Sequence, residues 1–257
     1  MGCHITESEP HIVGFICNWC SNAGADFADT KIQYPSNIHV TYVACSGRVD
    51  PPLVLRLLAE GVDGVMFACC PYISQNLQAR RRFALMIGLA EKTEFDLRRL
   101  RVEYVSPSEE QRFAQLVTEF IDQVKTLGPS PLSGNKPDPD LLLKLQAAKA
   151  VAEGFRMRML VGKEEQLVSK GNVYGKLLKQ EEFDKVIDEA VDSDYARQRI
   201  RLVLLREPMS AKDLSKRLRM DPREVLERVV AMRLSGWIDV QEVRGSSPIY
   251  RVLEVSR

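Results

Sequence analysis

The sequence predicts an α/β flavodoxin-like domain with a four-stranded parallel sheet. A mostly helical C-terminal region follows, and it ends in a winged-helix-like domain. Three observations carry this prediction. Short apolar segments alternate with helical patterns in the first half of the chain, which is typical of a parallel sheet covered by helices. A stretch rich in proline and glycine interrupts the pattern at 129–140. The last part has the order of three helices and a hairpin that is typical of winged helices.

The predicted domain boundaries follow from these changes of pattern. At 257 residues, the chain is long enough for one large domain or two small ones. We expect an α/β domain over 1–128, a linker over 129–140, a helical segment over 141–192 and a winged-helix-like domain over 193–257.

The first domain is predicted to contain four strands and the helices between them. The strands are expected at 11–17, 38–45, 64–70 and 101–105. The third is apolar throughout, as expected for a strand that is buried on both faces. Helices are expected at 22–28, 51–60, 74–93 and 106–127. The second helix has the clearest ends, because Asp50 is a good N-cap, Pro51 suits the first turn and Gly61 suits the C-terminus.

The second half is predicted to be helical up to a terminal hairpin. Long helices are expected at 140–160, 181–191 and 195–206. Ser210 and Asp221 begin capping boxes, so shorter helices are expected at 211–218 and 222–235. Strands then follow at 237–243 and 249–253.

Charge and hydropathy argue against membranes and nucleic acid. The net charge of +1 provides no strong field to attract DNA or an anionic bilayer. In the third helix of the winged-helix pattern, Glu224 and Glu227 would oppose phosphate contact. No apolar run is long enough to cross a membrane, and the polar, acidic start does not resemble a secretory signal. We therefore expect a cytoplasmic protein.

The main functional signal is the placement of the cysteines. All six lie in the first 70 residues: Cys3, Cys17, Cys20, Cys45, Cys69 and Cys70. In a cytoplasmic protein, clustered cysteines more often indicate metal or redox chemistry than disulfides. Five of them lie at or just after the ends of the first three predicted strands. The carboxyl ends of parallel strands share one edge, where ligands of open α/β sheets bind. Cys3, on a polar tail, is not expected to be a ligand.

The spacing alone does not identify the metal. Cys17 and Cys20 form a C-x-x-C pair, and Cys45 with one of Cys69 and Cys70 would complete four thiolates. Zinc and iron–sulfur clusters both take four thiolates, so both remain open at this point.

Several ordered motifs over residues 10–128 resemble one known family. They are Cys17-Asn18-Trp19-Cys20, Ala23-Gly24-Ala25-Asp26, Gln33-Tyr34-Pro35, Cys45-Ser46-Gly47-Arg48, Glu60-Gly61-Val62-Asp63-Gly64, and Tyr72-Ile73 with Asn76, Ala79 and Arg81-Arg82. The region resembles the delta (iron–sulfur) subunit of methyl-viologen-reducing hydrogenase. The resemblance implies a 2Fe–2S cluster in a non-catalytic subunit of an anaerobic oxidoreductase complex. It also implies a heterodisulfide-reductase-A-like flavoprotein and other redox subunits as partners.

The chain departs from the family pattern after the third strand. The family has a longer loop there with two cysteines several residues apart, whereas this chain has Ala68-Cys69-Cys70-Pro71-Tyr72. Cys70 aligns best with the first family cysteine. Cys69 is a substitute ligand, a spare or a non-ligand, so the fourth ligand stays open.

Two further side chains are candidates for tuning such a cluster. Arg48, three residues after Cys45, would place a cation near the thiolates and raise the reduction potential. Trp19, inside the C-x-x-C pair, would shield the cluster from water or meet the partner. Exposed loop and core-packing roles are the alternatives. The run from Arg80 to Arg82 is interpreted as solvated surface or as a docking surface.

Two other functions remain in competition with electron transfer. A redox-sensing winged-helix transcription regulator would use the cluster as sensor and would bind DNA as a homodimer. A zinc-stabilised scaffold would be colourless. No nucleophile–base group or phosphate-binding loop indicates independent catalysis.

Overall fold

The computed structural model describes residues 9–17, 38–71, 77–106 and 109–253. The chain divides into two compact units. One comprises Met1–Ala152 with Val161–Glu165, and the other Glu153–Leu160 with Gln166–Arg257. The predicted domain boundaries stay predictions.

A parallel four-stranded sheet forms the centre of the first unit. Its strands are β1 (Ile12–Cys17), β2 (Ile38–Val43), β3 (Gly64–Cys69) and β4 (Leu100–Tyr104). They lie in the order β2-β1-β3-β4, and every pair is parallel. The predicted four-stranded parallel sheet is confirmed. The order agrees with the first four strands of a flavodoxin-like sheet, in which the chain changes direction between β1 and β3.

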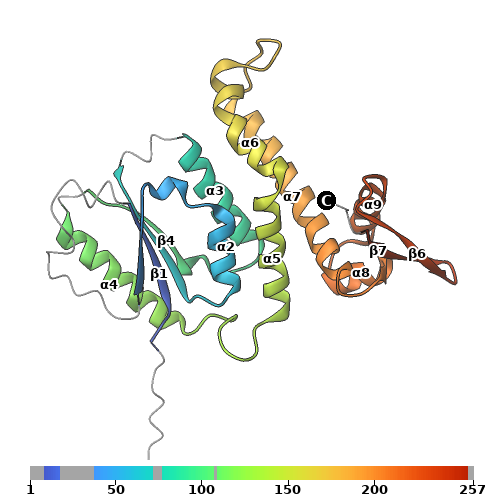
Figure 1. Cartoon of the computed structure of the whole chain (residues 1–257), viewed down its shortest axis with the longest axis horizontal. Helices are drawn as coiled ribbons and strands as arrows, with labels where there is room; N and C mark the ends of the chain where they lie inside the picture. Colours follow the sequence, from blue (N-terminus) through green and yellow to red (C-terminus); the bar gives the residue numbers. More distant parts are fainter. Residues whose placement is uncertain (1–8, 18–37, 72–76, 107–108, 254–257) are drawn as a thin grey trace, which may run out of the picture. The chain divides into compact units, whose positions relative to one another are not determined.

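Helices cover both faces of this sheet. Figure 1 shows α4 (Glu110–Leu127) on one face, and α2 (Pro51–Ala59) and α3 (Leu77–Lys92) on the other. A buried apolar cluster joins β1, β2 and β3 to α4. Gly64 allows the closest approach, because a Cβ atom there would lie 2.9 Å from a methyl of Val124. The central strands β1 and β3 are therefore buried along their whole length, as their apolar sequences predict.

Short turns refine the predicted boundaries around the strands. Strand β2 ends at Val43, so the prediction that Cys45 is its last residue is wrong. The chain instead bends into a 3₁₀ turn, η1 (Ser46–Arg48), in which Arg48 N donates to Cys45 O at 2.9 Å. The helix end predicted at Gly61 is confirmed. Its φ of +88° suits glycine, and a Cβ there would lie 2.8 Å from a backbone oxygen.

A buried polar cluster closes the sheet edge opposite the cysteines. Arg99, in the turn η3 (Leu97–Arg99), donates to Asp63 O at 3.0 Å and to three carbonyls of residues 127–129. The Asp63 carboxylate accepts from His11 N at 2.8 Å and from Ser130 N at 2.6 Å. Burial lowers the pKa of Arg99, while Asp63 opposes that shift. The cluster fixes the start of the predicted linker to the sheet.

The second half is mostly helical, with two changes from the prediction. The helix predicted at 140–160 is interrupted at Gly154, giving α5 (Pro139–Glu153) and α6 (Phe155–Glu165), and the short π-helix η4 (Gln166–Lys170) follows. The helices predicted at 181–191 and 195–206 form one helix, α7 (Gln180–Leu204). The expected break at 192–194 is wrong, because Asp194 accepts from Arg197 on the same helix at 3.2 Å.

The last elements follow the predicted order of helices and hairpin. They are α8 (Ala211–Leu218), α9 (Pro222–Leu234), β6 (Ile238–Arg244) and β7 (Ser247–Val252), with an additional short strand β5 (Met209–Ser210). The caps at Ser210 and Asp221 are confirmed by their side-chain bonds. The three strands lie in the antiparallel order β5-β7-β6. Assignment to the winged-helix class stays a prediction. None of the helices within the described ranges is long and apolar enough to cross a bilayer.

Candidate functional site

Two cysteines lie side by side where the chain changes direction in the sheet. Cys17 ends β1 and Cys69 ends β3, and the residues just before them, Ile16 and Ala68, are paired across the two strands. Both cysteines are buried. Residues two apart on a strand share a face. Cys17 and Cys69 therefore lie on the face of Phe15 and Phe67, whose rings stack at 5.2 Å.

A third cysteine reaches this edge from the neighbouring strand. Cys45 is half-buried and lies two residues after Val43, which pairs with Cys17. The η1 turn that follows Cys45 packs against β1, β3 and α3. Cys17 Sγ also donates to Ala44 O at 3.7 Å. The edge strand therefore brings its cysteine toward the two central ones.

The cysteines act on one another electrostatically. The pKa of the Cys69 thiol is raised to about 12, chiefly by burial. Negative charge on the neighbouring sulfurs of Cys70, Cys17 and Cys45 adds to this rise. A hydrogen bond from the Ser46 hydroxyl acts in the opposite sense and lowers the pKa. The four thiols that the structure describes thus belong to one cluster at the sheet edge.

Their donor chemistry fits a thiolate-bound metal, although the described residues do not by themselves form a metal site. No group of three or more His, Cys, Asp or Glu side chains in the described ranges is arranged to hold a metal ion. The predicted ligand Cys20 and the predicted shield Trp19 lie outside those ranges. Sulfur donors buried in an apolar edge suit iron–sulfur clusters or zinc. Binding would require the thiols to lose their protons.

A buried hydroxyl adds a hydrogen-bond donor to this edge. Ser46 has no exposed surface, and within the described ranges its Oγ has no partner at ordinary hydrogen-bond geometry. Buried polar groups are nearly always paired, so an unpaired one requires an explanation. The Cys69 sulfur is the acceptor that this hydroxyl approaches, because a hydrogen bond from Ser46 lowers the pKa of Cys69. Sequence reasoning missed Ser46 because a serine in a loop motif carries no sign of burial.

Arginines approach the cysteine turn from two elements. Arg48 lies within η1 and is exposed. Arg82, on α3, donates from Nη1 to Gly47 O at 2.8 Å. The interpretation of Arg80 to Arg82 as solvated surface is wrong for Arg81 and Arg82, because both make partly buried hydrogen bonds, whereas the docking interpretation stays a prediction. Of these three arginines, Arg80 alone is exposed.

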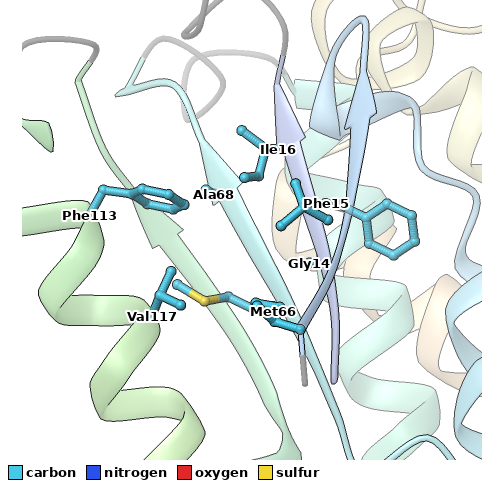
Figure 2. Close-up of a pocket in the computed structure, with 9 residues that line it drawn as sticks. Gly14, Phe15, Ile16, Met66, Ala68, Phe113 and Val117 are labelled. Atoms are coloured by element: carbon cyan, nitrogen blue, oxygen red, sulfur yellow. The ribbon is translucent and has the colours of Figure 1, made fainter. Parts of the chain in front are cut away.

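An apolar pocket lies on the opposite face of the sheet. Figure 2 shows Met66, Phe113 and Val117 pointing into it, while Phe15 points to the other side. Ile16 and Ala68, the neighbours of two of the cysteines, also line it. No charged side chain of the described residues lines the pocket, so it provides no metal ligand. It forms an apolar layer beneath the cysteine edge.

Comparison with known proteins identifies the family. A family model described as the delta subunit of methyl-viologen-reducing hydrogenase matches residues 12–128. The iron-sulfur subunit of the F420-non-reducing hydrogenase of Archaeoglobus profundus is 40% identical over 129 residues, which is 48% of this chain and 94% of that protein. The vhc iron-sulfur subunit of the corresponding hydrogenase of Methanococcus voltae is 36% identical over 133 residues, 49% of this chain and 92% of that protein. The chain belongs to this family.

The same region also resembles part of a larger protein. The ferredoxin:CoB-CoM heterodisulfide reductase A subunit from Methanosarcina mazei is 39% identical over 126 residues, or 47% of this chain. The chain spans only 16% of that protein's length. In this chain, the family region contains the whole parallel sheet and every described cysteine. The family match ends at residue 128, before α5.

Proposed function

We propose that this protein is an electron-transfer subunit that holds one 2Fe–2S cluster and exchanges electrons with a heterodisulfide-reductase-A-like flavoprotein. The observation that carries the proposal is the gathering of the cysteines that end β1 and β3 with Cys45, which follows β2, at the edge where the sheet changes direction. Family members named as iron-sulfur subunits support the cofactor class. The similarity to the heterodisulfide reductase protein supports the class of partner. The proposed setting is a cytoplasmic, anaerobic complex with other redox subunits.

Four thiolates would hold the cluster. Cys17, Cys20 and Cys45 are the first three, and we assign Cys69 as the fourth. Cys69 follows the residue paired with Ile16, so it lies beside Cys17 on the same face of the sheet. Cys70 is the next residue along the chain and lies just beyond β3. When bound, the cluster supplies a one-electron centre, and the protein determines its position and potential.

The surrounding side chains would stabilise the cluster and tune it. The burial of Cys17 and Cys69 would exclude water from a cluster that they hold. The buried Ser46 hydroxyl would donate to the Cys69 sulfur, and hydrogen bonds to sulfur raise the reduction potential. Arg48 would add positive charge from the exposed side, and Trp19 would limit solvent access.

The C-terminal unit is better suited to protein docking than to reading DNA. Helix α9 would be the recognition helix of a winged helix. It exposes an apolar row of Leu226, Val230 and Leu234, whose exposed fractions are 51%, 50% and 85%. A phosphate-binding face would instead carry basic side chains. This row therefore disfavours the alternative of a DNA-binding redox regulator.

Single Cys→Ser variants provide the test of the ligand set. After anaerobic cluster reconstitution, iron, acid-labile sulfide and the EPR spectrum of the reduced protein are measured. We expect Cys69→Ser to lose most of its iron and its signal, and Cys70→Ser to retain both. Cys3→Ser is the matched control and should behave as the wild type. Loss in Cys70→Ser with retention in Cys69→Ser would reverse the assignment. Retention in every single variant would contradict a four-thiolate cluster.

A further inference from the structure

The turn after Cys45 has few bonds of its own. It follows β2, an edge strand in which Ile38 is the one buried residue. Two backbone hydrogen bonds define the turn, from Arg48 N to Cys45 O at 2.9 Å and from Val49 N to Ser46 O at 3.1 Å. Cys45 is also less buried than Cys17 or Cys69. Among the described cysteines, Cys45 thus depends most on support from outside its own strand.

Part of that support comes from α3 through the side chain of Arg82. Arg82 Nη1 donates to Gly47 O at 2.8 Å, across 35 residues of sequence. Gly47 is buried, so its carbonyl has little access to water as an alternative donor. A guanidinium bond to a carbonyl is charge-assisted and directional. The bond joins a rigid helix to the turn, two residues after Cys45.

The charge of Arg82 is not neutralised by a carboxylate of the described residues. Its neighbour Arg81 does have such a partner, because Arg81 Nε donates to Glu164 Oε2 at 2.8 Å within the same compact unit. None of the ion pairs in the described ranges includes Arg82. The positive charge of Arg82 is therefore directed toward the cysteine turn.

We infer that Arg82 is a positioning residue for the cluster, with two effects. It holds the Cys45 turn in place, and its charge favours the reduced cluster. The second effect rests on the proposed function. Uptake of one electron from the partner adds one negative charge to the cluster while no iron–sulfur bond breaks. A nearby cation stabilises that added charge and so raises the reduction potential.

The test compares Arg82→Gln and Arg82→Lys with Arg80→Gln in the full chain. Arg80 lies on the same helix and is exposed, so Arg80→Gln is the matched control. The first readout is amide hydrogen exchange over residues 46–49 in cluster-free protein. We expect exchange in Arg82→Gln to be at least about fivefold faster than in the control, with Arg82→Lys intermediate, because the lost bond is one of few that hold the turn. Circular dichroism checks that the variants are folded.

The second readout is the reduction potential of cluster-loaded protein, followed by EPR. At a fixed ambient potential, we expect the ratio of reduced to oxidised cluster in Arg82→Gln to fall about threefold to tenfold, where tenfold equals about 59 mV for one electron. Arg82→Lys, which retains the charge, should fall less.

The outcomes separate this inference from the proposed function. Exchange and potential equal to those of Arg80→Gln would overturn the inference while leaving the cluster in place. Faster exchange with an unchanged potential would overturn the claim that the charge of Arg82 favours the reduced cluster. A wild-type chain that binds no cluster would overturn the proposed function, whereas the exchange measurement would still decide whether Arg82 holds the turn.

Discussion

Replacing Asp63 with alanine should destabilise the first unit without disturbing the cysteines. Asp63 lies before β3, at the edge opposite the cysteine cluster, and its carboxylate accepts bonds from His11 N and Ser130 N. Ser130 is buried, so its N–H would lose its partner and would be shielded from water. His11 is exposed, so its N–H would turn to water. Arg99 would lose a nearby opposite charge while keeping its carbonyl acceptors.

The size of the effect follows mainly from the loss of the two hydrogen bonds. An unsatisfied buried donor costs about 1–3 kcal/mol, and a lost charge-assisted bond at a partly exposed group costs about 1 kcal/mol more. We therefore expect Asp63→Ala to lower the free energy of unfolding by about 3 kcal/mol. Glu60→Ala is the matched control, because Glu60 pairs with Arg56 in an exposed i,i+4 salt bridge. Such pairs contribute below about 1 kcal/mol.

Urea unfolding followed by circular dichroism measures the difference between the two variants. We expect Asp63→Ala to unfold at clearly lower urea with a similar dependence on denaturant, while Glu60→Ala stays near the wild type. Below its unfolding transition, Asp63→Ala should still bind the normal amount of iron. Equal stability of the two variants would refute the buried-carboxylate argument. Loss of iron from folded Asp63→Ala would refute the separation of this edge from the cysteine site.

Three further predictions test the packing, the pH dependence and the cysteine environment. Gly64→Ala should destabilise the first unit by about 1–3 kcal/mol in thermal unfolding, because the added Cβ would overlap side chains of α4. An unchanged melting temperature would contradict the close packing of β3 against α4. The pKa of Asp96 is lowered, chiefly by the side-chain hydrogen bond from Arg98, so its small stabilising effect exists above its unfolded-state pKa and is lost as pH falls through the folded-state pKa. The Asp96→Asn variant should therefore lose less stability than the wild type when the pH is lowered. Parallel plots of the free energy of unfolding against pH for the two proteins would refute this. With a pKa raised to about 12, the Cys69 thiol of cluster-free protein should be alkylated at pH 8 at least about tenfold more slowly than Cys45, as mass spectrometry would measure; equal rates would show that Cys69 is not buried.

Local patterns predicted the sheet because each of its elements carries its own signal. Apolar runs indicated the strands, and the Asp50-Pro51 start and Gly61 end bounded α2 as the structure has them. Convergence of the cysteines could be predicted for the same reason, since the carboxyl ends of parallel strands share an edge. Small errors arose where polar residues resemble a break, as in α7, where Asp194 instead pairs with Arg197 inside a continuous helix.

Side chains that act across long sequence separations could not be predicted in this way. Arg82 meets Gly47 only after α3 folds against the η1 turn, and nothing in the run of three arginines distinguishes Arg82 from the exposed Arg80. The burial of Ser46 depends equally on packing between elements. Sequence reasoning therefore finds the candidate ligands and misses the residues that position them.

The most direct test of the central claim is a combined metal, sulfide and EPR measurement on the anaerobically reconstituted wild-type protein. We predict about two irons and two acid-labile sulfides per chain, a brown colour and an EPR signal that appears on one-electron reduction. A colourless protein that retains about one zinc per chain and acquires no sulfide would contradict the proposed electron-transfer function.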